Sequence, residues 1–230
     1  MKTYAIIPSG GTGSRFGSEI PKQYLKVKGK ELIAHTLEIF QASEFIDEIV
    51  VAAQTEYFEL LNTIKDKYNI SKLTKIIEGG KERQDSVYNA LSSLSACNDD
   101  LIAVHDAARP LLTQKILNNA IESAKNLGNS VVAIKARDTL IDSSHNELNY
   151  LDRNNVYYIQ TPQTFRYDIL KKAFDSAIAG NFYGTDESVI VNKIGEKIHF
   201  TDGLIRNFKI TTQSDFDLFK QICEDSEIQN

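Results

Sequence analysis

Short β-prone runs alternate with longer helical patterns along more than half of this chain, and this alternation limits the fold more than any other feature. The β-prone runs are nearly all apolar, which is typical of a sheet covered by helices on both faces. Between them, apolar residues recur at three- and four-residue spacing, as in Ile116, Ala120 and Ala124. The pattern predicts an α/β fold with a mostly parallel sheet. The expected strands cover residues 4–7, 48–52, 74–77, 101–105 and 130–134, and the expected helices cover 31–42, 57–68, 83–96 and 113–127.

The alternation breaks between residues 138 and 160, where two β-prone pieces flank the turn-forming letters SSHN at residues 143–146. This pattern predicts a β-hairpin arm that stands off the main sheet. A solitary hairpin is marginally stable in water, so we expect the arm to pack on another surface, with a second copy of the chain as the natural candidate. Beyond the arm, the expected elements are a helix over 167–179, a segment at 185–194, strands over 197–201 and 207–211, and a last helix from residue 214.

Composition bounds the number of domains and excludes several functional classes. With 230 residues, 42% of them hydrophobic, the chain can bury one substantial core, and we expect a single domain over residues 1–230. The net charge of −5, from 26 basic and 31 acidic residues, argues against a non-specific nucleic-acid binder. No apolar stretch reaches the length of about 18 residues that a membrane helix requires, and the N-terminus lacks the apolar segment of a signal peptide. We therefore expect a cytoplasmic protein with neither a membrane nor a nucleic-acid partner.

The two cysteines, Cys97 and Cys223, are far apart, and neither has a histidine at the spacing of metal ligands. A disulfide framework requires more cysteines at closer spacings, and a zinc site requires clustered ligands. We expect neither in this chain.

The glycine-rich segment PSGGTGSRFGSEIPKQYL, residues 8–25, follows the first predicted strand. It does not fit the dinucleotide fingerprint, because Gly17 comes one place late, and it lacks the Gly-Lys-Ser/Thr of a Walker A loop. Its earlier glycines allow backbone amides to approach an anion closely, while Arg15 and Lys22 add a forked and a compact cation. The segment predicts a site for a phosphate compound. The structural alternative is a solvated turn with surface cations.

The segment AVHDAARP, residues 103–110, places a carboxylate at the end of the fourth predicted strand, where open α/β sheets bind ligands. Asp106 is a candidate ligand for Mg²⁺, which binds through one or two carboxylates together with substrate phosphates and water. Arg109 would suit a second anionic group. The alternative is that Asp106 caps a turn and pairs with Arg109 at the surface. We expect His105 to be a packed or hydrogen-bonded strand residue rather than a catalyst.

The segment EGGKERQDSVYNAL, residues 78–91, ends a strand and begins a helix, for which Asp85 or Ser86 would serve as a cap. Three more segments follow in order: QTPQTF at 160–165, TDES at 185–188 and NFKITT at 207–212. Together the six segments resemble the cytidylyltransferase family that includes 2-C-methyl-D-erythritol 4-phosphate cytidylyltransferase of the non-mevalonate isoprenoid pathway. The resemblance covers nearly the whole chain, from Ala5 to about Phe216.

The resemblance implies a Rossmann-like nucleotidyltransferase fold, CTP and Mg²⁺ as ligands, and a homodimer. It implies that Ser9, Gly10 and Gly11 cradle the nucleotide and that Gly80 and Ser86 read the cytosine. It assigns Arg15, Lys22 and Lys209 to catalysis by charge stabilisation, and Asp106 to the metal and the substrates. The positions that it places around the sugar-phosphate acceptor are Arg109, Thr139, Arg153, Thr161 and Thr185. The family's arm crosses to the partner subunit, which implies that Arg153 completes the partner's site.

The implied reaction is in-line attack of an acceptor phosphate on the α-phosphorus of CTP. An acceptor phosphate that is already ionised requires no general base, which agrees with a site rich in cations and without a catalytic triad. We expect methylerythritol phosphate as the acceptor, with ribitol 5-phosphate or another alditol phosphate as the alternative. Lys81 and Ile141 depart from the family's frequent residues near the base and the acceptor.

Two other classes are alternatives to this reading. A nucleotide-sugar glycosyltransferase could share the sheet, but the Asp-x-Asp motif at 215–217 begins a predicted helix, where capping explains it. A non-catalytic nucleotide sensor would bind CTP without requiring Arg109 or Lys209.

Overall fold

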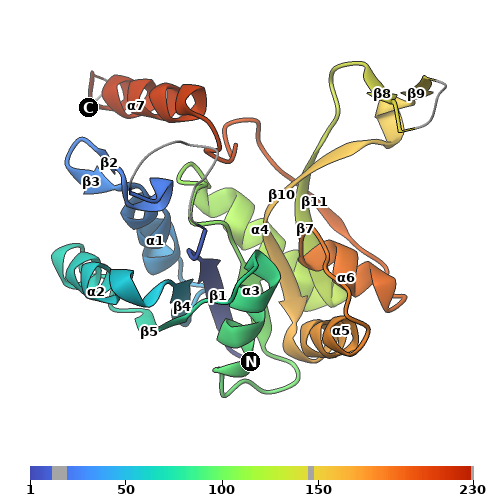
Figure 1. Ribbon diagram of the computed structural model, residues 1–230, viewed down its shortest axis with the longest axis horizontal. Coiled ribbons are helices and arrows are strands. Elements are labelled where there is room, and N and C mark those ends of the chain that lie inside the picture. Colours follow the sequence, from blue (N-terminus) through green and yellow to red (C-terminus); the bar gives the residue numbers. More distant parts are fainter. Residues whose placement is uncertain (12–19, 145–147, 229–230) are drawn as a thin grey trace.

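The computed structural model describes residues 1–11, 20–144 and 148–228, and at their centre lies a seven-stranded sheet in the order β11-β7-β10-β6-β1-β4-β5 (Figure 1). The neighbouring strands are parallel except β10, which runs antiparallel to both β6 and β7. This mostly parallel sheet confirms the predicted α/β fold. Its strands are β1 (Thr3–Pro8), β4 (Glu48–Ala53), β5 (Leu73–Glu78), β6 (Leu101–Val104), β7 (Asn129–Lys135), β10 (Tyr157–Arg166) and β11 (Phe200–Asp202).

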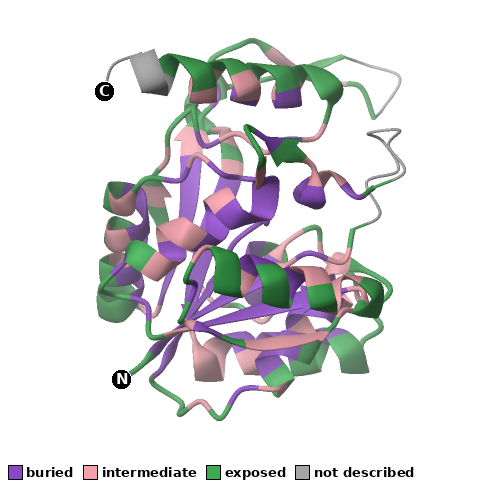
Figure 2. Ribbon diagram, turned by 90° about the vertical axis from the view of Figure 1, so that its left-hand side faces the viewer, coloured by how far each residue is buried: buried purple, intermediate pink, exposed green. Residues whose placement is uncertain are grey.

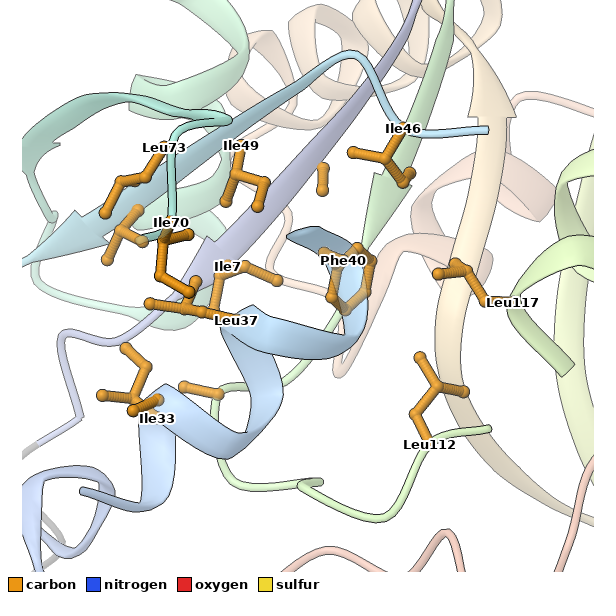
Figure 3. Close-up of a cluster of buried hydrophobic side chains, with 14 of the residues drawn as sticks. Ile7, Ile33, Leu37, Phe40, Ile46, Ile49, Ile70, Leu73, Leu112 and Leu117 are labelled. Carbon is orange, nitrogen blue, oxygen red and sulfur yellow. The ribbon is translucent and has the colours of Figure 1, made fainter. Parts of the chain in front are cut away.

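Helices cover both faces of the sheet, because its strands are apolar on both sides. Along β1, Ala5 and Ile7 pack with α1, α2 and α4, whereas Tyr4 and Ile6 pack with residues of α3, α5 and α6. Figure 3 shows the first cluster, where Phe40 of α1 lies against the sheet. The strands are largely buried between helices whose outer surfaces are exposed (Figure 2). The helices are α1 (Leu32–Ala42), α2 (Phe58–Lys67), α3 (Arg83–Ser92), α4 (Gln114–Leu127), α5 (Tyr167–Ala179), α6 (Glu187–Lys193) and α7 (Gln213–Ile228).

Local signals in the sequence explain where α4 begins and ends. The Thr113 hydroxyl accepts a hydrogen bond from the backbone N–H of Ile116 at 3.3 Å, which satisfies a donor in the first turn. Gly128 ends the helix at a φ of 85°, a left-handed conformation that glycine adopts without strain. The sequence prediction of this helix over 113–127 is therefore correct to within one residue.

The hairpin arm is present but shorter than predicted. Strand β8 (Leu140–Asp142) pairs antiparallel with β9 (Asn149–Leu151), and the pair stands away from the body (Figure 1). Residues 157–160, which the sequence assigned to the arm, belong instead to β10. The reason is that the backbone of Tyr157, Tyr158 and Ile159 pairs with β7, so the central sheet continues into the base of the arm.

The predicted strand over residues 207–211 was wrong, and that over 197–201 was displaced, since β11 covers Phe200–Asp202. Residues 207–211 are irregular because their backbone N–H groups donate to a loop carbonyl and to a side chain of α7 rather than to a strand. The N–H of Ile210 donates to the carbonyl of Ala108, and the N–H of Thr211 donates to the Asp215 carboxylate. Asp215 also accepts from the N–H of Thr212 at 2.8 Å, so capping accounts for the first acid of the Asp-x-Asp motif.

A short 3₁₀ helix, Lys22–Tyr24, and the small β2 (Lys26–Val27) and β3 (Lys30–Glu31) pair precede α1. Neither Cys97 nor Cys223 forms a disulfide. Within the described ranges, none of the helices combines the length and the apolar character needed to cross a membrane.

Candidate active site

A cleft of about 440 Å³ lies at the carboxyl ends of β1 and β6, beside the start of α3. It is lined by residues 8–11 and 22–23 of the glycine-rich segment, by the β5–α3 connection, by residues 106–108 after β6 and by the irregular segment near residue 209. The cleft therefore brings together four segments that are distant in the sequence. The predicted residues that line it are Ser9, Gly10, Gly11, Lys22, Gly80, Ser86, Asp106 and Lys209.

The other predicted site residues lie elsewhere. Arg109 and Thr161 are buried behind Asp106, and Thr185 is exposed just before α6. Thr139 and Arg153 are exposed at the base of the arm, where the Arg153 guanidinium donates to the carbonyl of Arg137 at 3.2 Å. Neither of these two residues lines the cleft. Arg15 lies outside the described residues.

The start of the glycine-rich segment is held from behind by the residues that follow Lys22. The buried Gln23 amide donates to the carbonyls of Ser9 at 2.8 Å and Gly11 at 2.9 Å. The Ser9 hydroxyl donates to the Tyr24 hydroxyl at 3.1 Å, and the Tyr24 ring stacks on Tyr57. Burial raises the pKa of Tyr24 to about 12, against the smaller lowering effect of the Ser9 hydrogen bond. One turn of 3₁₀ helix therefore shapes the loop and places a lysine in the same cleft.

We expect Gln23→Met to weaken CTP binding about tenfold, because two carbonyls of the glycine-rich segment lose their donor and each net hydrogen bond contributes about 0.5–1.5 kcal/mol. Methionine has a similar length and adds no charge beside Lys22. Calorimetric titration with CTP measures the effect. Gln41→Met is the matched control, since the Gln41 amide lies outside the cleft, in α1, and donates to the Ser71 hydroxyl at 3.0 Å. Equal CTP affinity of the Gln23 variant and the wild type would contradict this role.

The connection between β5 and α3 is closely packed around Ser86. Its hydroxyl accepts from the N–H of Gly80 at 3.0 Å and donates to the carbonyl of Glu82 at 3.1 Å. A hydroxyl oxygen has two lone pairs, so Ser86 keeps the capacity to accept from an amino group of a base. A Cβ on Gly80 would lie 2.2 Å from the Cβ of Asp85, so only glycine fits there. The Asp85 carboxylate accepts from the N–H of Glu82 at 2.9 Å, which confirms its predicted capping role.

Asp106 is a buried carboxylate surrounded by cations. Arg83 Nε lies 3.2 Å from Oδ1, while Arg109 Nε and Lys209 Nζ each lie 3.2 Å from Oδ2. Burial raises the pKa of Asp106, but the charges of Arg83, Lys209 and Arg109 outweigh it and hold the pKa well below its usual value. The carboxylate is therefore ionised at neutral pH. The predicted partnership of Asp106 and Arg109 is present, although it is buried rather than at the surface.

His105 and Thr161 fix the turn that carries Asp106. The Arg109 carbonyl can only accept, so His105 Nε2 donates to it at 3.1 Å, and Nδ1 accepts from the Thr161 hydroxyl at 2.9 Å. The N–H of Asp106 donates to the same hydroxyl at 3.2 Å. Burial lowers the pKa of His105 to about 4, so the ring is neutral and keeps this single tautomer. His105 is thus a packed, hydrogen-bonded residue, as the sequence indicated.

Arg109 also holds the segment that carries Lys209. Its Nη1 donates to the carbonyl of Asn207 at 2.7 Å, and the buried Asn207 amide donates to the carbonyl of Thr161 at 2.8 Å. The N–H of Ile210 donates to the carbonyl of Ala108 at 2.9 Å. These bonds lie on both sides of Lys209, so they place its ammonium group beside Asp106.

The donor set of the cleft fits a magnesium ion better than a protein-built metal cage. In the described parts of the chain, no group of three or more His, Cys, Asp or Glu side chains could hold a metal ion. Asp106 lines the cleft, and its Oδ1 accepts from Arg83 and retains a lone pair. Mg²⁺ requires only one or two carboxylates when substrate phosphates and waters supply its other ligands.

Comparison with known proteins identifies the family. The family model described as 2-C-methyl-D-erythritol 4-phosphate cytidylyltransferase matches residues 3–225. The chain belongs to this family. A relative with that name from Clostridioides difficile (strain 630) is 40% identical over 219 residues, which cover 94% of this chain and 92% of the relative. Another, from Geotalea uraniireducens (strain Rf4), is 36% identical over 218 residues, or 94% of each chain.

Solved structures of cytidylyltransferases share the fold over nearly the whole length. The enzyme of that name from Francisella tularensis matches with a TM-score of 0.81 and 31% identity, covering 96% of this chain and 99% of that chain. The 4-diphosphocytidyl-2C-methyl-D-erythritol synthase from Anaerococcus prevotii matches with a TM-score of 0.85 and 25% identity, covering 97% and 96% of the two chains.

Two residues that line the cleft, and a third that contacts one of them, were not predicted from the sequence. Gln23 follows Lys22 directly, and Arg83 was predicted only as part of a helix start. Glu187 lies within the TDES segment and is only 1% exposed. A buried glutamate requires a cationic partner, but burial is visible only in the folded chain.

Proposed function

We propose that this protein transfers the cytidylyl group of CTP to 2-C-methyl-D-erythritol 4-phosphate, a step of isoprenoid precursor synthesis in the non-mevalonate pathway. The observation that carries the proposal is the convergence of the glycine-rich segment, Lys22, Asp106 and Lys209 in one cleft of a chain that belongs to this family. We also propose a cytoplasmic location, which agrees with CTP as the substrate.

In the proposed reaction, an oxygen of the acceptor phosphate forms a bond to the α-phosphorus of CTP. The bond from that phosphorus to the bridging oxygen of the β-phosphate breaks, and pyrophosphate leaves with the electron pair. The acceptor phosphate is largely ionised at neutral pH, since its second pKa is about 6, so no protein base is required. This agrees with the burial and the low pKa of His105.

The residues of the cleft act by binding and by neutralising charge. In the proposed complex, the backbone of Gly10 and Gly11 binds the triphosphate, while Lys22 and Lys209 stabilise negative charge that grows on the transferring phosphate. Arg15 shares this role in the proposal. Asp106 would hold Mg²⁺, which supplies further neutralisation of the phosphates when it is bound. Arg109 and Thr161 hold the segments that carry Asp106 and Lys209.

The direct test is release of pyrophosphate from CTP and Mg²⁺ in the presence of methylerythritol 4-phosphate, ribitol 5-phosphate or neither. Release that depends on methylerythritol 4-phosphate, and stops when EDTA removes the metal, is the expected result. Faster release with ribitol 5-phosphate would make that compound the acceptor. Equal or absent release in all three mixtures would refute cytidylyl transfer and favour a nucleotide sensor.

We also propose that the chain forms a homodimer through its arm. The arm exposes apolar side chains, with Leu148 at 63% and Tyr150 at 66% exposure, and a two-stranded hairpin has no core of its own. Thr139 and Arg153 do not line the cleft of their own chain. Contribution of the arm to a partner's cleft would explain the position of both residues.

Mixing Arg153→Ala protein with Lys22→Ala protein tests this arrangement. Each variant alone is expected to be inactive, and mixed dimers are expected to regain about a quarter of the wild-type activity, because statistical exchange makes half the dimers mixed and each mixed dimer has one intact site. Pyrophosphate release after subunit exchange measures the recovery. No recovery, in spite of exchange demonstrated with labelled subunits, would contradict a shared site.

A further inference from the structure

An ion pair that the reaction scheme leaves without a role joins α3 to α6 at the edge of the cleft. Arg83 begins α3, and Glu187 begins α6. The guanidinium meets the carboxylate with two parallel contacts, from Nη1 to Oε1 at 2.6 Å and from Nη2 to Oε2 at 3.0 Å. The Glu187 side chain is 2% exposed, whereas that of Arg83 is 27% exposed and lines the cleft.

The third nitrogen of the same guanidinium fixes Asp106. Arg83 Nε donates to Asp106 Oδ1 at 3.2 Å. A guanidinium is planar and rigid, so two contacts to Glu187 determine the direction of Nε. The buried Glu187 thus orients the Arg83 nitrogen that contacts Asp106, although Glu187 does not itself contact Asp106.

Further contacts tie the segment before Glu187 to α3. The buried Gln84 side chain, next to Arg83, accepts from the N–H of Gly184 at 2.8 Å and donates to the carbonyl of Phe182 at 3.0 Å. On the other side, the N–H of Ser188 donates to Gln163 of β10 at 2.8 Å. Residues 182–188, which include Thr185, are therefore anchored to both α3 and the sheet.

We propose that Arg83, held by Glu187, is a positioning residue. It keeps Asp106 and residues 184–188, on the acceptor side of the proposed reaction, at fixed positions relative to the residues of the cleft that bind the nucleotide. This role deepens the proposed function and rests on it. A purely stabilising role does not account for the pair, because apolar residues of similar volume often replace a buried ion pair without loss of stability. Apolar residues would not direct a donor at Asp106.

This difference between stability and positioning supplies the test. The double variant Arg83→Met/Glu187→Met removes both charges together, so no buried charge is left without a partner. We expect its thermal midpoint to equal or exceed that of the wild type. We expect kcat for pyrophosphate release to fall on the order of 10- to 100-fold, since small errors in position at a reacting centre have effects of this size.

Two further measurements separate positioning from nucleotide binding. The Kd for CTP, measured by calorimetry, is expected to change less than about threefold in the double variant, while the loss appears in kcat and in KM for the acceptor. Arg83→Lys keeps the charge but not the fork, so its kcat is expected to lie near that of the double variant. Glu187→Asp keeps a carboxylate that can accept from the Arg83 guanidinium, so its kcat is expected to lie between those of the double variant and the wild type.

Lys171→Met/Asp175→Met is the matched control, because that pair is an ion pair on the exposed face of α5. Its kcat is expected to equal that of the wild type. A double Arg83/Glu187 variant with wild-type kcat would overturn the proposed positioning role, and so would a loss of CTP affinity as large as the loss of kcat. A wild-type protein inactive with every alditol phosphate would instead overturn cytidylyl transfer, and with it this role.

Discussion

Lys209→Ala is expected to lower kcat for pyrophosphate release on the order of 10²- to 10³-fold, the usual effect of removing one fixed electrostatic stabiliser. The ammonium lies 3.2 Å from Asp106 Oδ2, and the Lys209 side chain is 36% exposed and lines the cleft. Hydrogen bonds on both sides of it hold the backbone at Asn207 and Ile210, so the replacement removes the charge without releasing the segment. The thermal midpoint is expected to change little.

Lys220→Ala is the control for charge, because Lys220 is a partly exposed lysine that pairs with Asp217 on α7, outside the cleft. Its kcat is expected to equal that of the wild type. Saturating CTP and acceptor should not rescue Lys209→Ala, since the lost interaction is strongest in the transition state. A variant with unchanged kcat and only a raised KM for CTP would show that Lys209 binds the ground state alone.

Asp106→Asn is expected to lower the free energy of unfolding at pH 7 by about 3 kcal/mol, because breaking a buried ion pair leaves charges without a partner. The side chain is 9% exposed and faces three cations. Loss of the proposed magnesium ligand should also reduce turnover on the order of 10²-fold. Urea denaturation and pyrophosphate release measure the two effects separately. Asp217→Asn, at an exposed pair, is the control and should change stability by less than about 1 kcal/mol.

The Asp106→Asn variant also tests how the free energy of unfolding depends on pH. Burial raises the pKa of Asp106, but Arg83, Lys209 and Arg109 lower it well below the ordinary value of 3.8. A carboxylate whose pKa is lower in the folded state contributes stability that is fully present above the unfolded value and is lost as pH falls through the folded value. The gap in unfolding free energy between wild type and Asp106→Asn should therefore narrow below about pH 4. A gap that stayed constant down to pH 2 would contradict this account.

Much of the fold could be predicted from local patterns. The apolar runs at residues 4–7 and 48–52 lie within β1 and β4, and the three- and four-residue spacing of Ile116, Ala120 and Ala124 marks the buried face of α4. These predictions succeeded because each depends on the periodicity of a single element. The predictions for the end of the arm and for residues 207–211 failed, because a β-prone run does not reveal which backbone it will pair with.

The candidate site also has features that the sequence predicts and features that only the folded structure shows. Glycines after β1, cations near them and an acid after β6 could be read from the sequence, since each stands where α/β sheets bind phosphate and metal. The tertiary structure added the side chains that hold these groups in place. Gln23 is buried against two loop carbonyls, and the hydroxyl of Thr161 is occupied by His105 and by the backbone of Asp106.

The sequence by itself therefore determined the layered α/β fold and the family resemblance, because these depend on local periodicity and on the order of motifs, and it supplied the hypothesis that the first loop binds phosphate. Only the tertiary structure determined which charged side chains contact one another. Arg83 and Glu187 are 104 residues apart, yet their side chains join at 2.6 Å and direct a donor at Asp106. Such a contact depends on the packing of two helices against one sheet, and no local pattern in the chain encodes it.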